Sequence, residues 1–339
     1  MNRRKFIRNA TLSSAAIPFI NNVAQGKVIS AVKDINIGLI GLDTSHAIAF
    51  TKIINDKANP LAQGFKVANA YPYGSRTIES SSSRIPQYIT EVKALGVEVV
   101  DSIEKVIGAS DVIMLLTNDG KLHLEQILPV LKAKKPVFVD KPVAAHLDEV
   151  IKIYDAVKQY NVPMFSSSPL RYLEGAQRVR YKDAVGKVIG AEAYSPQKTE
   201  QSHTDLYWYG IHGVEILYTM MGPGCESVRR IIGTDQDVVV GKWKDGRIGT
   251  YKGDVQTRQY YGGTAYGTTG TLSVGPFAGY DALAAVILQF FKDLKSPVDT
   301  LETIELYTFM EAADVSKQQN GDWVNLQKVY DDTVRNSKK

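Results

Sequence analysis

Residues 136–142 read Pro136-Val137-Phe138-Val139-Asp140-Lys141-Pro142. The apolar run ends abruptly at two charged residues and a proline, which is typical of a buried parallel strand that stops there. Ligands of open α/β sheets bind outside the carboxyl ends of the strands. The pattern therefore predicts a ligand site at Lys141, where burial would lower the pKa of the ammonium group. On position alone, the alternative is a lysine that begins a surface loop.

Strand-like and helix-like segments alternate around this stretch. We expect strands at residues 35–40, 65–71, 98–100, 111–116, 137–139 and 163–165, and helices at 46–57, 86–95, 102–107, 121–133 and 146–160. This alternation predicts an α/β fold with a doubly wound parallel sheet and right-handed crossovers, the Rossmann architecture of dinucleotide-binding domains.

The pattern changes after residue 168. Expected strands at residues 188–194, 228–233, 237–243, 249–252, 257–261 and 270–274 are separated by glycine-containing turns, and expected helices span 207–221, 280–294 and 301–317. Lys244-Asp245-Gly246 fits a hairpin turn. We therefore predict three parts: a targeting segment at residues 1–30, the Rossmann domain at 31–167, and an α+β domain with a largely antiparallel sheet at 168–339, for which the family resemblance described below implies substrate binding and oligomerisation.

The amino terminus carries the whole net charge of the chain. The formal charge is +4, from 40 basic and 36 acidic residues, and Arg3, Arg4, Lys5 and Arg8 account for the difference. The neutral remainder argues against nucleic acid as a partner. The paired arginines resemble a twin-arginine export signal, which implies a periplasmic protein exported folded; an ordinary basic tail is the alternative. No stretch is long and apolar enough to span a bilayer. Cys225 is the only cysteine, so no intramolecular disulfide can form.

The first strand leads into Gly41-Leu42-Asp43-Thr44-Ser45-His46. A dinucleotide fold places three glycines in this turn, and only Gly41 is present, because Asp43 and His46 occupy the other two places. Thr44, Ser45 and the helix amino terminus can still bind an anion. The alternative is an ordinary strand–helix turn in which Asp43 or Ser45 is the cap.

The second strand is followed by Ser75 and Arg76, with no acidic residue to bind a ribose hydroxyl. These two residues favour the 2′-phosphate of NADP over NAD, although an exposed basic loop would look the same.

Four motifs together resemble the Gfo/Idh/MocA family, which includes glucose–fructose oxidoreductase and inositol dehydrogenase. They are the first turn, Thr117-Asn118 followed by His123, Asp140-Lys141-Pro142, and Gly210-Ile211-His212. The resemblance covers nearly all of residues 33–330. It implies an NAD(P) cofactor bound by Thr117, Asn118, His123 and Asp140, with Thr117 and Asn118 on its nicotinamide side. It also implies a catalytic role for Lys141 and a substrate-site arginine at Arg171. Asp140 stands where the family usually has glutamate, and the Thr117 motif is one residue longer than usual.

The resemblance also implies a catalytic role for His212. The family has an aspartate four residues before this histidine, and here that position is Trp208, which could instead stack on a sugar ring. A histidine that accepts a proton needs a partner on its other ring nitrogen. Glu215, on the same helix face, is the expected partner. Other candidates are His203, Asp205, Tyr207 and Tyr209. We also expect His203 and Asp205, with Arg171 and Trp208, to bind substrate.

We therefore expect an NAD(P)-dependent oxidoreductase that acts on a hydroxyl of a sugar, glycoside or polyol and needs no metal. Lys141 would stabilise the developing alkoxide and His212 would take the proton, with Glu215 or Tyr209 in support. One alternative is glycoside cleavage or epimerisation through a keto-sugar, in which the cofactor is recycled. Another is a sugar-binding protein without catalysis, which Asp43, His46 and Trp208 favour. The resemblance also implies a homo-oligomer through the carboxyl-domain sheet.

Overall fold

The computed structural model describes residues 34–256, 258 and 260–337. The expected targeting segment at residues 1–30 lies outside the described residues. In the described part of the chain, no helix is both long enough and apolar enough to cross a membrane.

The first sheet has six parallel strands in the order β3-β2-β1-β4-β5-β6. This is the Rossmann order. The strands are β1 (Ile35–Ile40), β2 (Phe65–Tyr71), β3 (Glu98–Val99), β4 (Val112–Leu115), β5 (Val137–Val139) and β6 (Met164–Ser166). The connecting helices are α1 (Ser45–Asn55), η1 (Pro60–Ala62), α2 (Glu79–Ser82), α3 (Ile85–Ala94), α4 (Ile103–Ala109), η2 (Gly120–Leu122), α5 (His123–Lys132) and α6 (Leu147–Tyr160). The predicted Rossmann fold is confirmed.

Burial on both faces explains why these strands read as continuous apolar runs. All four residues of β4 and all three of β5 are buried, as expected for a parallel sheet that is covered by helices on both faces. Thr44 caps α1 by accepting a hydrogen bond from the backbone N–H of His46 at 3.4 Å. The cap is therefore Thr44, between the two expected candidates Asp43 and Ser45.

The second sheet has seven strands in the order β12-β11-β7-β10-β9-β8-β13. Only the β7–β10 pair is parallel, so the predicted, largely antiparallel sheet is confirmed. The strands are β7 (Val188–Pro196), β8 (Cys225–Ile231), β9 (Gln236–Trp243), β10 (Ile248–Asp254), β11 (Gly262–Gly267), β12 (Thr271–Val274) and β13 (Val324–Asn325). The helices are η3 (Pro169–Tyr172), α7 (Glu174–Tyr181), α8 (Asp205–Trp208), α9 (Ile211–Met221), α10 (Asp281–Asp293), α11 (Thr300–Gln318) and α12 (Leu326–Asn336).

In the part of the chain after residue 168, the turns explain where the predicted elements agree with the structure and where they differ. The hairpin at Asp245 is confirmed, since Gly246 has a φ of 85° and its N–H donates to Trp243 O. The strand predicted at 257–261 is wrong, because Arg258, Tyr260 and Tyr261 lie in no strand. Strand β11 starts only at Gly262, in a glycine-rich segment of low strand propensity. The helix predicted at 207–221 is interrupted after α8, so His212 lies in the first turn of α9. Helices α7 and α12 were not predicted.

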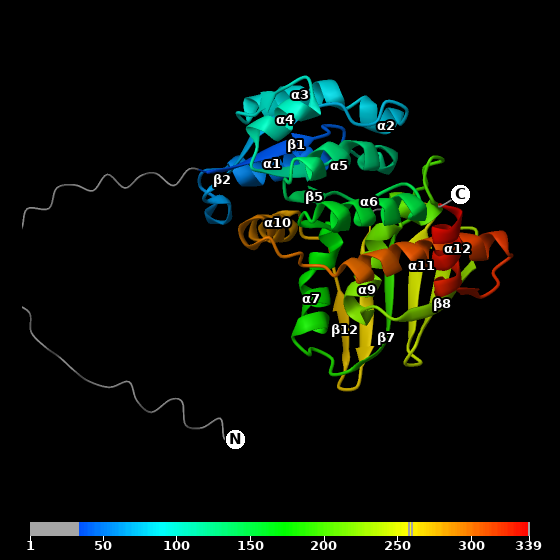
Figure 1. Cartoon of the computed structure of the whole chain (residues 1–339). Coiled ribbons are helices and arrows are strands. Elements are labelled where there is room, and N and C mark those ends of the chain that lie inside the picture. Colours follow the sequence, from blue (N-terminus) through cyan, green and yellow to red (C-terminus); the bar gives the residue numbers. More distant parts are fainter. Residues whose placement is uncertain (1–33, 257, 259, 338–339) are drawn as a thin grey trace, which may run out of the picture. The chain divides into compact units, whose positions relative to one another are not determined.

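Helix α10 follows β12 of the second sheet in the sequence but packs against the first sheet (Figure 1). Its Phe290 lies 4.9 Å from Phe165 of β6, and Phe165 lies 5.1 Å from Phe138 of β5, measured between ring centroids. Phe50 of α1 extends this aromatic row beyond Phe138. The predicted domain boundary at residue 168 thus separates the two sheets but leaves out this helix.

Helix α9 packs along β7 and β10, and every one of its residues is buried. Gly213 permits this close approach, because a Cβ there would lie 2.5 Å from a ring carbon of Tyr251. The tight seam fixes His212, the neighbouring residue, at the amino end of the helix.

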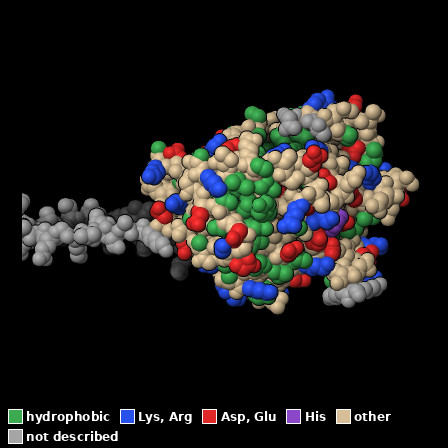
Figure 2. All heavy atoms as spheres, turned by 90° about the horizontal axis from the view of Figure 1, so that it is seen from above, with side chains coloured by type: hydrophobic (Ala, Val, Ile, Leu, Met, Phe, Trp, Pro, Cys, Tyr) green, Lys and Arg blue, Asp and Glu red, His purple; other side chains and the backbone are tan. Residues whose placement is uncertain are grey.

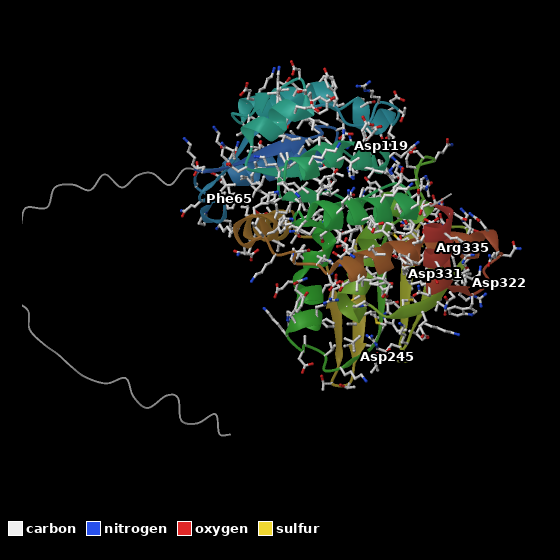
Figure 3. The ribbon with its side chains drawn as sticks, viewed as in Figure 1. Phe65, Asp119, Asp245, Asp322, Asp331 and Arg335 are labelled. Carbon is white, nitrogen blue, oxygen red and sulfur yellow. The ribbon has the colours of Figure 1, made fainter. Side chains whose placement is uncertain are left out.

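Labelled residues identify the edges of the two sheets. Figure 3 shows Phe65, at the start of β2, and Asp119, beyond the end of β4, near opposite ends of the parallel strands of the first sheet. Asp245 marks the hairpin end of the second sheet that is remote from the first. The site described below lies at the Asp119 edge, where the parallel strands end. On the face drawn in Figure 2, acidic and basic side chains are interspersed around a band of hydrophobic ones.

Candidate active site

A pocket with about 900 Å³ of empty space lies at the carboxyl edge of the parallel sheet. Segments from both halves of the chain line it. Residues up to Lys141 contribute Thr44, Ser45, His46, Ser80, Arg84, Asn118 and Lys141. Later segments contribute Pro169, Leu170, Lys198, Trp208, Tyr209, His212, Tyr261, Phe277 and Tyr280. No acidic side chain is among these residues.

Lys141 follows β5 directly and points its ammonium group into the pocket. The residue is only 7% exposed, and its ammonium group has no hydrogen bond or ion pair within the described residues. Burial lowers the pKa of Lys141; Asp140 opposes this shift and Arg84 adds to it. A buried ammonium without a protein partner is suited to bind an oxygen atom of a ligand.

Asp140 is the immediate support of Lys141. Its carboxylate is fully buried and lies 2.7 Å from Nδ1 of His46. Burial alone would raise the pKa of Asp140, but attraction to His46 and Lys141 leaves it below the usual range. The pair therefore ties the end of β5 to the start of α1 and sets a negative charge beside Lys141.

His212 faces the same pocket from α9, and Ser168 holds its ring. The Oγ of Ser168 lies 2.7 Å from Nδ1 of His212 and also accepts a hydrogen bond from the N–H of Leu170 at 3.1 Å. Nε2 has no partner within the described residues, so it is the atom left for a ligand. Burial lowers the pKa of His212 well below its usual value, and the charges of Lys141 and His46 add to the effect. The imidazole is therefore neutral at pH 7.

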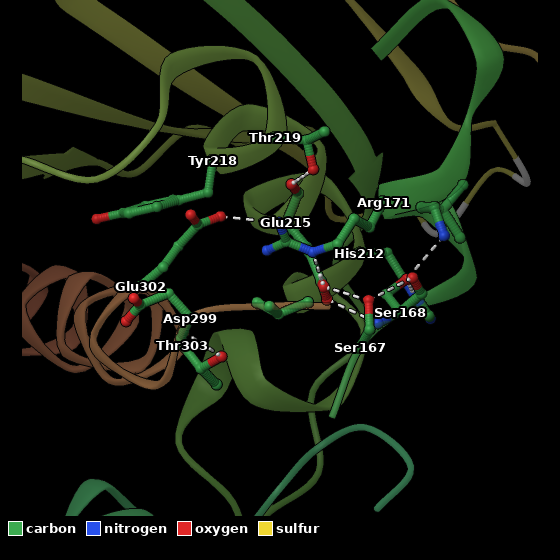
Figure 4. A network of polar contacts seen from close by, with 12 residues as sticks. Ser167, Ser168, Arg171, His212, Glu215, Tyr218, Thr219, Asp299, Glu302 and Thr303 are labelled. Atoms are coloured by element: carbon green, nitrogen blue, oxygen red, sulfur yellow. Dashed lines mark hydrogen bonds and ion pairs between the residues drawn. The ribbon is translucent and has the colours of Figure 1, made fainter. Parts of the chain in front are cut away.

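Glu215 does not contact His212, contrary to expectation. It accepts hydrogen bonds from Ser167 Oγ and from the backbone N–H of Ser168, both at 2.7 Å, and from Nε of Arg171 at 2.7 Å (Figure 4). Arg171 is buried and also binds Glu302 at 2.8 Å. Glu215 therefore acts on His212 only through Ser168, and Arg171 supports this network instead of lining the pocket.

Two expected cofactor residues, His123 and Thr117, form hydrogen bonds inside the protein instead. The ring nitrogens of His123 lie 2.6 Å from Thr117 O and 3.0 Å from Val143 O, so His123 joins two loops in the interior. Thr117 donates its hydroxyl to Gln126 at 2.6 Å and does not line the pocket. Asn118 does line it.

Two expected substrate residues lie outside the pocket. Asp205 forms ion pairs with Arg230 and Lys317, and the Nε2 of His203 accepts the N–H of Gly120 at 3.1 Å. His203 also packs against Trp208, with 5.1 Å between ring centroids. Trp208 and Tyr209 do line the pocket.

Four pocket residues were not predicted from the sequence: Ser80, Arg84, Lys198 and Tyr261. Ser80 and Arg84 lie in and after a serine run that reads as a polar loop, and Tyr261 reads as packing. Its ring lies 5.6 Å from that of His212. Only their proximity in three dimensions identifies them. No group of three His, Cys, Asp or Glu side chains in the described part of the chain could hold a metal ion.

The two ends of a nicotinamide dinucleotide fit this site differently. At the nicotinamide end, Asn118, Lys141 and His212 line open space, and the amino terminus of α1 faces it. At the adenosine end, Ser75 is fully buried: its N–H donates to Asp43 at 2.8 Å and its Oγ to Asp119 at 3.1 Å. Ser75 is thus unavailable to a 2′-phosphate, contrary to expectation, and Arg76 is exposed outside the pocket. The residues fit the nicotinamide half and do not fit the adenosine half.

Comparisons with known proteins agree with this architecture. Residues 35–167 match the model of the oxidoreductase family with an NAD-binding Rossmann fold, GFO_IDH_MocA. An uncharacterized oxidoreductase of Streptococcus pneumoniae serotype 4 (strain ATCC BAA-334 / TIGR4) is 24% identical over 150 residues, which are 40% of this chain and 41% of that protein. The chain thus matches less than half the length of that relative.

Solved structures match over most of the chain. A putative NADPH-dependent oxidoreductase from Desulfitobacterium hafniense superposes with a TM-score of 0.69 at 14% identity, over 88% of this chain and 99% of that one. The scyllo-inositol dehydrogenase of Lactobacillus casei, solved with NAD(H) and scyllo-inositol, gives 0.67 at 16% identity, over 87% and 100%. A putative myo-inositol dehydrogenase from Sinorhizobium meliloti 1021 gives 0.68 at 14% identity, over 86% and 99%. The chain therefore has the fold of these proteins, and its residues 35–167 are similar to the NAD-binding Rossmann domain of the GFO_IDH_MocA oxidoreductase family.

Proposed function

We propose that the protein is a nicotinamide-dependent oxidoreductase that acts on a hydroxyl-bearing carbon of a sugar, glycoside or polyol. The observation that carries the proposal is the meeting of Lys141 and His212, from opposite halves of the chain, in one pocket at the carboxyl edge of the parallel sheet. The inositol dehydrogenases with the same fold support the substrate class.

A bound nicotinamide would supply the hydride acceptor. The ammonium group of Lys141 donates a hydrogen bond to the reacting hydroxyl oxygen and stabilises negative charge as it develops there. His212 accepts the hydroxyl proton at Nε2 when its Nδ1–H donates to Ser168 Oγ. Trp208 and Tyr209 provide flat apolar surface for the ring of the substrate. Pro169 and Leu170, both buried, close the pocket beside η3.

The direct test is nicotinamide reduction by the purified full chain with a panel of polyols and glycosides, followed at the absorbance of the reduced cofactor. Lys141→Met and His212→Ala should each lower the rate by about a hundredfold or more, the usual size of such contributions. If either variant keeps nearly the wild-type rate, the proposed roles are wrong. Product analysis distinguishes net oxidation from a keto-sugar route, because that route leaves no reduced cofactor.

We further infer export by the twin-arginine route and assembly through the second sheet. The basic residues 3–8 support export, since the rest of the chain has no net charge. Exposed Ile231, Ile248 and Tyr266 on the second sheet support assembly. Fusion of residues 1–33 to a reporter that is active only outside the cytoplasm tests export. Sedimentation of wild type and Ile248→Lys tests assembly; an unchanged molecular mass would contradict this interface.

A further inference from the structure

The loop after β1 and the loop after β2 are joined by the side chain of Asp43. This residue stands where a dinucleotide fold has the glycine that lets the backbone approach the diphosphate. Its carboxylate is fully buried and accepts hydrogen bonds from the N–H of Ser75 at 2.8 Å and of Asn118 at 3.0 Å. One side chain thus bridges the loops that follow β1, β2 and β4.

Backbone hydrogen bonds extend the pairing of β1 with β2 into the start of the same two loops. The N–H of Gly41 donates to Tyr71 O at 2.9 Å, and that of Leu42 donates to Pro72 O at 3.0 Å. Gly74 lies directly on Asp43, since a Cβ at position 74 would be 2.2 Å from the carboxylate. The ribose and diphosphate of a dinucleotide normally lie between these loops. Here the carboxylate of Asp43, with its hydrogen bonds to Ser75 and Asn118, lies between them.

The pocket ends where the bridge begins. It is lined by Thr44, Ser45 and His46 of the first turn, but by none of residues 41–43 and none of residues 71–79. Arg84 lines it near the amino terminus of α1. Lys141, whose ammonium group has no hydrogen bond or ion pair to any residue that the structure describes, lines the same space. The pocket therefore offers positive charge, from Arg84 and Lys141, to one phosphate group. Its lining does not extend to the loop after β2, where an adenosine would bind.

We propose that Asp43 closes the adenosine side of the crevice, so that the protein binds the nicotinamide mononucleotide portion of its cofactor and gains no affinity from the adenosine portion. This inference rests on the proposed function for its choice of ligand. The phosphate of the mononucleotide lies at the amino terminus of α1 with Arg84 as its counter-charge.

Calorimetry on the wild-type full chain tests the closure without any substitution. Nicotinamide mononucleotide and NAD should bind with dissociation constants within about threefold of each other, and ADP should give no heat at millimolar concentration. ADP binding below millimolar concentration, or NAD at least tenfold tighter than the mononucleotide, would overturn the closure and leave the proposed function standing.

The variant Asp43→Gly separates the two proposals. Removal of the bridge should create ADP binding and make NAD at least tenfold tighter than the mononucleotide. Asp101→Gly, at an exposed carboxylate that does not line the pocket, is the control and should behave as wild type. If wild type binds neither the mononucleotide nor NAD, the proposed function fails. In that case Asp43→Gly still tests whether Asp43 closes the adenosine side: a gain of ADP binding supports the closure, and no gain overturns it.

Discussion

The hydroxyl oxygen of Ser168 lies 2.7 Å from Nδ1 of His212, in the place where a catalytic histidine more often has a carboxylate. A serine can donate or accept this hydrogen bond, so it fixes the ring without fixing one tautomer and without adding charge. This single contact determines how His212 can act.

Loss of the Ser168 hydroxyl should impair catalysis more than binding. Ser168→Ala leaves Nδ1 without a partner, and we expect kcat to fall about tenfold with KM nearly unchanged, the effect of one strong hydrogen bond. Ser168→Thr restores the hydroxyl and should recover most of the rate. A purely structural role would instead lower the midpoint of thermal unfolding in both variants, while the kcat of the correctly folded fraction would stay at the wild-type value.

The charge of Lys141 should be essential. Lys141→Met keeps the length of the side chain but removes the donor, and kcat should fall by about a hundredfold to a thousandfold. Lys132→Met, at an exposed position on α5, is the matched control and should leave steady-state kinetics unchanged. Equal rates for the two variants would exclude Lys141 from the reaction.

The pH profile should report a neutral histidine. Because the pKa of His212 is lowered well below 6.5, Nε2 is available throughout neutral pH, and the rate should fall only at more acidic values. The pKa of Lys141 is also lowered, so the alkaline limb should begin below 10.5. The measurement is kcat/KM from pH 5 to 10. An acid limb centred at or above 6.5 would contradict the assignment.

Ionisation of Asp43 should lower the free energy of unfolding at neutral pH. Burial raises its pKa to about 6 from an ordinary 3.8, against the opposing effect of its backbone hydrogen bonds. The folded state therefore binds the proton more tightly, and stability from this group falls as pH rises from about 4 through 6. Relative to wild type, Asp43→Asn should gain roughly 2–3 kcal/mol in free energy of unfolding between pH 4 and 7. Urea unfolding at both pH values measures this difference, and a constant difference would refute it.

The buried ion pair between Arg171 and Glu215 should dominate the stability of the site. Removal of one partner leaves a buried charge, so Glu215→Gln should lower the free energy of unfolding by about 3–5 kcal/mol. Asp148→Asn breaks an exposed pair with Lys152 on α6 and should cost less than about 1 kcal/mol. Similar losses in the two variants would show that burial does not strengthen the first pair.

The strands could be predicted from the sequence where their bounds depend on a local residue pattern. The bounds of β1 and β2 follow from apolar runs between turn residues, and the end of β5 at Val139 follows from the charged pair and proline after it. Strand β11 was missed because its glycines carry no strand signal, and its position depends on pairing with β7. The break before α9 is likewise a tertiary effect.

The candidate site was predictable only in outline. Strand ends and a family resemblance pointed to Lys141 and His212, which share the pocket. The bridge from Asp43 to Ser75, the Ser168 contact and the supporting role of Arg171 depend on distances between remote segments. No sequence spacing encodes these distances, so they required three-dimensional coordinates.

The position of α10 in the chain also constrains biosynthesis. During translation the parallel sheet emerges first, but the helix that covers Phe165 and Phe138 is made only after strands β7 to β12 of the second sheet. The nascent chain must therefore keep an apolar surface uncovered until residue 293 has left the ribosome. Because of this delay, we expect a chaperone that covers exposed aromatic surface to assist folding of this protein. We also expect chains truncated before α10 to aggregate.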